Sequence, residues 1–79
     1  MSPSKFISVF DKSNNNLLFE WEINIDTAIL KEIFVAYSDD PELMMVYPFN
    51  RKIAKNLVKY QNFHFDFERN LYEMITYFI

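Results

Sequence analysis

Residues 17–25 read LLFEWEINI, and in this stretch a large apolar side chain recurs at every second position. A period of two is typical of a β-strand, since successive side chains of an extended chain point to opposite faces. One face would carry Leu17, Phe19, Trp21, Ile23 and Ile25, and the other would carry Leu18, Glu20, Glu22 and Asn24. We therefore expect a strand with one packed face and one face left to solvent or to a partner.

A second strand is predicted upstream, over the β-branched and aromatic run from Lys5 to Phe10. The segment DKSNNN, residues 11–16, lies between the two runs and is rich in residues that favour turns. The chain contains no glycine, so we expect asparagine to take positions that need a left-handed backbone. The two runs together predict an antiparallel hairpin.

Two segments after the hairpin show the apolar spacing of amphipathic helices. The first begins with Asp26 or Thr27 as N-cap and ends near Ser38. The second, residues 51 to about 60, follows Asn50, which is a favourable N-cap residue. Both helices are expected to pack their apolar side on the sheet.

A third helix is predicted to begin near Asp66, on a stripe formed by Phe67, Leu71, Met74, Ile75 and Phe78. Between the first two helices, Leu43–Tyr47 is interpreted as a third strand that Pro48 ends. The predicted fold class is therefore α+β, with an antiparallel β-hairpin or a small three-stranded sheet and about three helices packed on one face.

Length and composition narrow the class of protein. A chain of 79 residues with this apolar content predicts a single folded domain, residues 1–79. It has no cysteine, which excludes disulfides and thiolate metal sites, and no glycine-rich phosphate loop. No signal peptide or membrane-spanning run is recognisable, so a cytoplasmic protein with no membrane role is expected. No catalytic motif is present, and we expect a binding protein and not an enzyme.

Acidic and basic residues are separated along the chain. From Glu20 to Glu42 there are seven acidic residues and one basic residue, whereas from Leu43 to Phe65 there are four basic residues and no acidic one. A continuous acidic field would raise the rate of encounter with a cationic partner by roughly 10 to 1000 fold. Neighbouring aromatic residues would add contact area. The predicted partner-binding residues are Glu20, Glu22, Tyr37, Asp39, Asp40, Glu42, Tyr47 and Phe49.

Other chemistry is less well supported by the sequence. His64 and Asp66 are two residues apart, but no nucleophile or further ligand accompanies them at a motif spacing. The acidic loop of residues 39–42 lacks the alternating ligands and glycine of a calcium loop. Four basic residues on the second helix could contact phosphates, yet the overall acidity opposes nucleic-acid binding. We therefore predict no cofactor, no metal and no nucleic acid.

The opening FDK hairpin, the segment DDPELMMVYP and the tail FDFERNLYEM resemble small bacterial immunity proteins of polymorphic toxin or contact-dependent growth-inhibition systems. The resemblance implies that the chain binds the cognate toxin domain in the cytosol and inhibits it. Such toxins are commonly nucleases with a cationic cleft, which an acidic protein can occupy. The expected partner is thus a cationic toxin domain, and the free protein is expected to be a monomer or weak dimer.

Two other interpretations stay open at the level of sequence. The acidic residues can simply keep the surface solvated, as charged side chains on helices and loops usually do. Alternatively, the apolar excess can serve a structural or oligomerisation module that forms a symmetric homodimer, with acidity maintaining solubility. The oligomeric state of the free protein distinguishes the homodimer from the toxin inhibitor.

Overall fold

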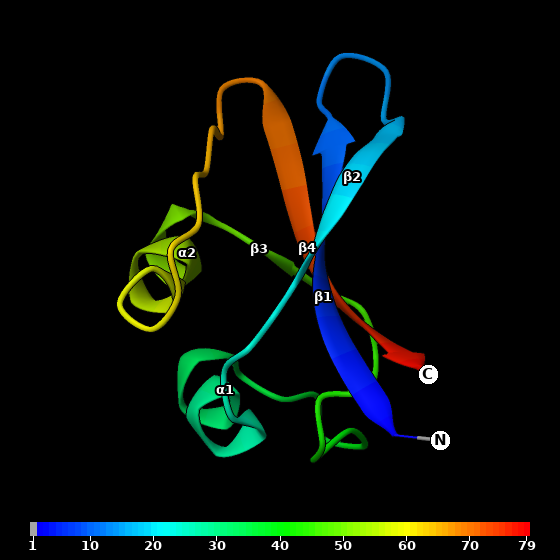
Figure 1. Ribbon diagram of the computed structural model, residues 1–79, viewed down its shortest axis with the longest axis vertical. Helices are drawn as coiled ribbons and strands as arrows, with labels where there is room; N and C mark the ends of the chain where they lie inside the picture. Colours follow the sequence, from blue (N-terminus) through cyan, green and yellow to red (C-terminus); the bar gives the residue numbers. More distant parts are fainter. Residues whose placement is uncertain (1) are drawn as a thin grey trace.

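The computed structural model describes residues 2–79, which form a small α+β fold around one four-stranded antiparallel sheet. The elements are β1 (Pro3–Asp11), β2 (Leu17–Glu22), α1 (Thr27–Ile33), β3 (Tyr47–Phe49), α2 (Arg51–Leu57) and β4 (Asn70–Phe78). The strand order is β2-β1-β4-β3, so β1 and β4 are central. Both helices lie on one side of the sheet, at the left in Figure 1. The predicted α+β class is confirmed. The structure has four strands and two helices, whereas the sequence predicted up to three strands and about three helices.

The predicted hairpin is present as β1 and β2, which pair antiparallel with Ile7 opposite Trp21. The turn between them is held by Asp11, whose carboxylate accepts hydrogen bonds from the backbone N–H and the hydroxyl of Ser13. Asn15 has a φ of 61°, the left-handed conformation expected of asparagine in a chain without glycine. A local property of the sequence therefore determines this half of the sheet.

The first predicted helix is present but shorter than expected. It was predicted to reach Ser38, whereas α1 ends at Ile33, and Phe34 already has an extended backbone. The following residues are held by other contacts, since the Tyr37 N–H donates to the Tyr47 hydroxyl and its carbonyl accepts from the Asp40 N–H. These bonds fix the chain in a non-helical path toward β3.

The second helix begins where the sequence predicts. Asn50 is its N-cap, and the side-chain oxygen accepts from the N–H groups of Lys52 and Ile53. This cap satisfies two of the donors that have no partner within the helix. The helix ends at Leu57, and a turn takes the place of the predicted last residues to Tyr60.

The predicted third helix is wrong, because Asn70–Phe78 is strand β4. This strand pairs with β1 along its whole length and with β3 on its other side. Central strands carry apolar residues on both faces, which hides the alternation of a half-exposed strand. The spacing of Leu71, Met74, Ile75 and Phe78 then also fits a helix, and this is the reason for the error.

The third strand was also placed wrongly, since it is Tyr47–Phe49 and not Leu43–Tyr47. Pro48 lies within it and does not end it. Proline is tolerated there because β3 is an edge strand, on which a missing N–H need not interrupt a ladder. Residues 43–46 form a loop instead.

The space between the sheet and the helices is filled largely by aromatic rings. Trp21 contacts Phe63, Phe65 and Tyr72 with centroid separations of 5.7, 5.7 and 6.1 Å. Each aromatic pair of this kind adds about 0.5–1.5 kcal/mol beyond the area it buries. The buried core consists of Ile7, Val9, Ile23, Leu30, Phe34, Leu43, Tyr47, Leu57, Phe63, Tyr72 and Met74.

Candidate protein-binding site

The sheet has a second face, on which none of the helices of residues 2–79 packs (Figure 1). Strand register identifies its positions, because residues opposite one another in neighbouring strands share a face. Ile7, Trp21 and Met74 define the helix-covered side, so the alternate positions belong to the other side. We call these positions the open face: Ser4, Phe6, Ser8, Phe10, Glu20, Glu22, Pro48, Leu71, Glu73, Ile75 and Tyr77. Leu17, opposite Phe10, is left out because the register of β1 and β2 shifts between Val9 and Phe10.

Glu20 lies on the open face, on the edge strand β2, and is held in place by two hydrogen bonds. Its Oε2 accepts from the Ser8 hydroxyl and from the Tyr77 hydroxyl, both at 2.7 Å. Because Tyr77 is on β4, the carboxylate of β2 reaches across β1. The hydrogen bond to Glu20, burial and the charge of Glu20 together raise the pKa of Tyr77 above its usual 10.0. The ring of Tyr77 also packs edge-on against Phe6, with centroids 5.3 Å apart.

Glu22 and Glu73 complete the acidic group of this face. Among residues 2–79, neither carboxylate has a side-chain hydrogen bond or an ion pair. The open face includes three glutamates and no lysine, arginine or histidine. Apolar side chains lie between them, and Leu71 and Tyr77 are each 42% exposed. Carboxylates beside partly exposed aromatic and aliphatic groups match the chemistry of a basic protein surface.

Asp40 was predicted to bind the partner, but the structure places it inside the loop before β3, only 5% exposed. Its carboxylate accepts from the backbone N–H groups of Met44 and Met45, both at 2.8 Å, and from the Tyr47 hydroxyl at 2.6 Å. Burial opposes ionisation of Asp40, but these hydrogen bonds and the nearby Lys5 outweigh it and lower the pKa of the carboxyl below 3.8. Asp40 thus shapes the loop.

Tyr47 and Phe49 also occupy structural positions. Tyr47 is buried, and burial together with the hydrogen bond to Asp40 raises the pKa of its phenol above 10.0. Phe49 packs against Phe34 and Phe65 in the core, with centroids 5.7 Å away in both cases. Neither side chain is presented for capture of a partner in this structure.

The remaining predicted residues are exposed but lie away from the open face. Tyr37 stacks on Tyr47 with centroids 4.4 Å apart and keeps 43% of its surface exposed. Asp39 is exposed, and Glu42 forms an ion pair of 3.0 Å with Lys31. The predicted acidic residues therefore lie on two elements: Glu20 and Glu22 are on the open face, and residues 37–42 form a loop whose Glu42 lines a cleft together with Glu22.

A buried lysine fastens that loop to the sheet. Lys5 is on the core side of β1, and its Nζ donates to the carbonyl of Leu43 at 2.6 Å, to Thr76 Oγ1 at 2.9 Å and to the carbonyl of Glu42 at 3.4 Å. Burial lowers the pKa of Lys5 below 10.5, although the charges of Asp40 and Glu42 act in the opposite direction. Leu43 itself has a φ of 56°, a strained value for a side chain of this size.

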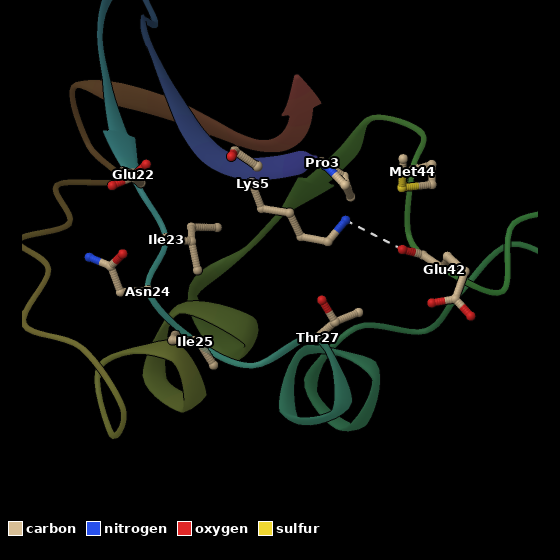
Figure 2. A pocket seen from close by; sticks show the side chains of 10 residues that line it. Pro3, Lys5, Glu22, Ile23, Asn24, Ile25, Thr27, Glu42 and Met44 are labelled. Carbon is tan, nitrogen blue, oxygen red and sulfur yellow. Dashed lines mark hydrogen bonds between the residues drawn. The ribbon is translucent and has the colours of Figure 1, made fainter. Parts of the chain in front are cut away.

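A cleft of about 520 Å³ opens beside this lysine, between the start of β1, the segment after β2 and the start of α1. Figure 2 shows Lys5 entering it from β1 and reaching toward Glu42, with Glu22, Asn24 and Thr27 around the opening. All three donors of the ammonium group are already used, so Lys5 is not available to hold an anionic ligand. Glu22 and Glu42, which both line the cleft, add negative charge there.

The open-face residues that the sequence did not assign to the site include Phe6, Glu73, Ile75 and Tyr77. Three of them belong to β4, which was predicted as a helix, so their shared face with Glu20 could not be recognised. The run of Ile75, Thr76 and Tyr77 was the available signal, since β-branched and aromatic residues favour strands.

The residues considered for other chemistry have ordinary surroundings. Asp66 holds a turn by accepting from the Glu68 N–H and lies 3.8 Å from Arg69, and His64 is exposed. Arg51 lies over the ring of Phe67 at 5.6 Å. Within residues 2–79, no group of three or more histidine or acidic side chains is arranged to hold a metal ion, and no helix is long and apolar enough to cross a membrane.

Fold and site together define a small α+β domain with one sheet face covered by helices and the other open, acidic and partly apolar. The chain belongs to the family described as a domain of unknown function, DUF7683, which matches residues 4–74. No curated protein gives a significant match. No solved structure gives one either.

Proposed function

We propose that this chain is a binding protein of the immunity type, which inhibits a cationic toxin domain by covering it with the open face. The observation that carries the proposal is the composition of that face: three glutamates, partly exposed apolar side chains and no basic residue on a sheet surface without helices. The resemblance to immunity proteins supplies the class of partner. A nuclease domain with a basic substrate cleft is the partner of this class that the charge pattern fits best.

The proposed mechanism has an electrostatic and an apolar part. Glu22 and Glu73 attract lysine and arginine side chains over a distance of about 10 Å at 0.1 M salt, which accelerates encounter. Glu20 is already oriented by Ser8 and Tyr77, so little side-chain entropy is lost when it accepts a further donor. The apolar part of the face then reduces the rate of dissociation, because contact area buried between charged groups excludes water.

The proposal predicts that a toxin domain is encoded beside the gene of this chain, and that domain provides the test. Growth of cells that express this domain is measured with the wild-type chain, with the Glu22→Lys/Glu73→Lys variant, and with a control variant, Glu32→Lys/Glu68→Lys. The control has the same net charge change, but its residues are exposed and lie in α1 and in the turn before β4. We expect protection by the wild type and by the control, and loss of protection by the open-face variant.

Binding kinetics of the purified pair provide a second readout. The open-face variant is expected to associate at least about tenfold more slowly at low salt, with little further decrease as salt is raised. Equal protection and equal kinetics for the two double variants would show that the open face is not the contact surface. Absence of any toxin effect on growth, or of any protection by the wild type, would overturn the immunity function itself.

Light scattering coupled to size exclusion tests the homodimer alternative. A two-fold contact through the open face would bring the three glutamates of each copy into one contact without any open-face basic residue to pair with them, and like charges in such a contact are destabilising. We therefore expect a monomer of 9.6 kDa. If the wild type is a dimer, and if the Glu22→Lys/Glu73→Lys variant changes the measured fraction of dimer in either direction, the structural module is favoured.

A further inference from the structure

β2 is an edge strand whose outer side has no neighbouring strand in residues 2–79. Natural proteins usually protect such edges with lysine, proline or a covering segment, because unpaired backbone groups can pair with another chain. The sequence of β2, LLFEWE, contains neither lysine nor proline. Leu17, Leu18 and Phe19 are 53%, 49% and 45% exposed. This edge therefore begins with three exposed apolar residues, and its charged residues are Glu20 and Glu22, with no lysine.

The direction of the backbone groups along β2 follows from its pairing with β1. The Ile23 N–H donates to the carbonyl of Lys5, so Ile23 has its backbone groups directed toward β1. In an antiparallel ladder this direction alternates, which makes Trp21 and Phe19 bond to β1 as well. Glu20 and Glu22 lie between them, so their N–H and carbonyl groups point to the free side.

Gln61 confirms this direction and protects one end of the edge. Its side-chain Nε2 donates to the carbonyl of Glu22 at 2.9 Å, and its Oε1 accepts from the Asn24 N–H at 2.7 Å. This amide thus satisfies two of the backbone groups that an added strand would otherwise satisfy. Among residues 2–79, no group outside β2 bonds to the N–H or carbonyl of Glu20 or to the N–H of Glu22, which lie directly before the protected end.

The side chains on either side of this edge indicate which strand would fit it. Glu20 and Glu22 point to the open face, and the half-exposed ring of Phe19 points to the other face. A second copy paired antiparallel about Glu20 would place the two Glu20 carboxylates opposite one another, which is unfavourable. A strand with basic residues at every second position, and apolar residues between them, satisfies both faces.

We propose that the outer edge of β2 takes up an extended segment of the cationic partner as a fifth strand, with lysine or arginine beside Glu20 and Glu22 and apolar side chains beside Phe19. This inference rests on the proposed function and specifies how the partner is held. Backbone hydrogen bonds to an added strand give affinity, and the alternate side chains give specificity. The side chains of the added strand that lie beside Glu20 and Glu22 then extend the open face.

The peptide acetyl-Lys-Val-Lys-Val-Lys-amide is the probe, and amide hydrogen exchange of the full chain, measured by NMR, is the readout. In the free protein, the amides of Phe19 and Trp21 should exchange slowly and those of Glu20 and Glu22 should exchange rapidly. Adding the peptide should slow exchange at Glu20 and Glu22 at least about tenfold. Rapid exchange at both positions with saturating or millimolar peptide overturns the proposal.

Two modified peptides separate backbone pairing from attraction between charges. In an added antiparallel strand, the residue opposite Glu20 shares its face and exchanges both backbone bonds with it. N-methylation at the lysines then removes the amides that would face Glu20 and should weaken binding at least about tenfold. N-methylation at the valines alters amides that point away and should leave much of the affinity. Equal binding of both peptides would mean contact with the open face alone, which overturns the added strand while leaving the proposed function standing. Slow, concentration-dependent exchange at Glu20 without peptide would identify a second copy as the occupant and overturn the proposal.

Discussion

Replacing Lys5 by methionine tests whether this buried cation holds the loop before β3 on the sheet. Methionine retains most of the apolar stem and removes only the ammonium group. The ammonium donates at 2.6 Å to the carbonyl of Leu43 and at 2.9 Å to Thr76 Oγ1, with a longer bond of 3.4 Å to Glu42. The two short bonds are therefore the ones that determine the effect.

The expected loss of stability depends on which hydrogen-bond donors remain for each acceptor of the Lys5 ammonium group. Leu43 keeps a weaker donor, because Thr76 Oγ1 lies 3.3 Å from the same carbonyl. A buried acceptor without a partner costs about 1–3 kcal/mol, and the lowered pKa of Lys5 shows that part of this loss is offset by removing a desolvated charge. We expect Lys5→Met to reduce the free energy of unfolding by about 1–3 kcal/mol, and to lower Tm by about 4–8 °C for each kcal/mol.

Urea unfolding followed by the fluorescence of Trp21, together with thermal circular dichroism, measures this change. Lys52→Met is the matched control, because Lys52 is exposed and its side chain has no hydrogen bond among residues 2–79. The control should stay within about 0.5 kcal/mol of the wild type. If Lys5→Met is as stable as Lys52→Met, the lysine does not fasten the loop and the reasoning is refuted.

The same variant has a pH dependence with a definite sign. The pKa of Lys5 is lowered in the folded chain. In a pH range below 10.5, the unfolded chain therefore binds more protons than the folded chain. Stability rises with pH in that range. The advantage of the wild type over Lys5→Met should therefore grow as pH approaches 10.5, and a constant difference from neutral pH upward would contradict the assigned cause.

Three further predictions concern the cap and the buried hydrogen bonds. Asn50→Ala should lower the free energy of unfolding by about 1 kcal/mol in urea titrations, because it removes the acceptor for two N–H groups of α2; Asn62→Ala, in an exposed loop, should have no comparable effect. The pKa of Asp40 is lowered, so its contribution is present above 3.8 and is lost as pH falls through the lowered value; Asp40→Asn should flatten the acid limb of a stability–pH curve, and an unchanged limb would contradict this. The pKa of Tyr47 is raised, so the folded chain retains a proton that the unfolded chain releases above 10.0. Stability should therefore fall with rising pH there, and Tyr47→Phe should show a smaller alkaline decrease in the same assay.

Local signals explain which parts of the fold were predictable. The hairpin follows from the period of two in residues 17–25, and the start of α2 follows from Asn50, since both features depend on neighbouring residues. The loop of residues 43–46 depends on Lys5, which is 38 positions away from Leu43 in the chain. No short window of sequence includes both partners of that contact, and the strand was therefore placed four residues too early.

The candidate site was also predictable only where its residues follow from a local sequence pattern. Glu20 and Glu22 were assigned to an uncovered face from the alternation in β2 alone. Glu73 and Tyr77 were missed because β4 is central, so that its apolar residues on both faces imitate a helix. Asp40 and Tyr47 were assigned to the surface because their charge and polarity are visible in the sequence, whereas the hydrogen bond that buries them is a tertiary contact.

The two edges of the sheet differ in a way that limits how large an assembly can become. β3 contains only three residues, and the middle one is Pro48, which has no N–H to offer. Sheet growth from β3 of one molecule to β2 of the next is therefore unfavourable. Concentrated solutions should accordingly remain free of fibres built by joining β3 to β2.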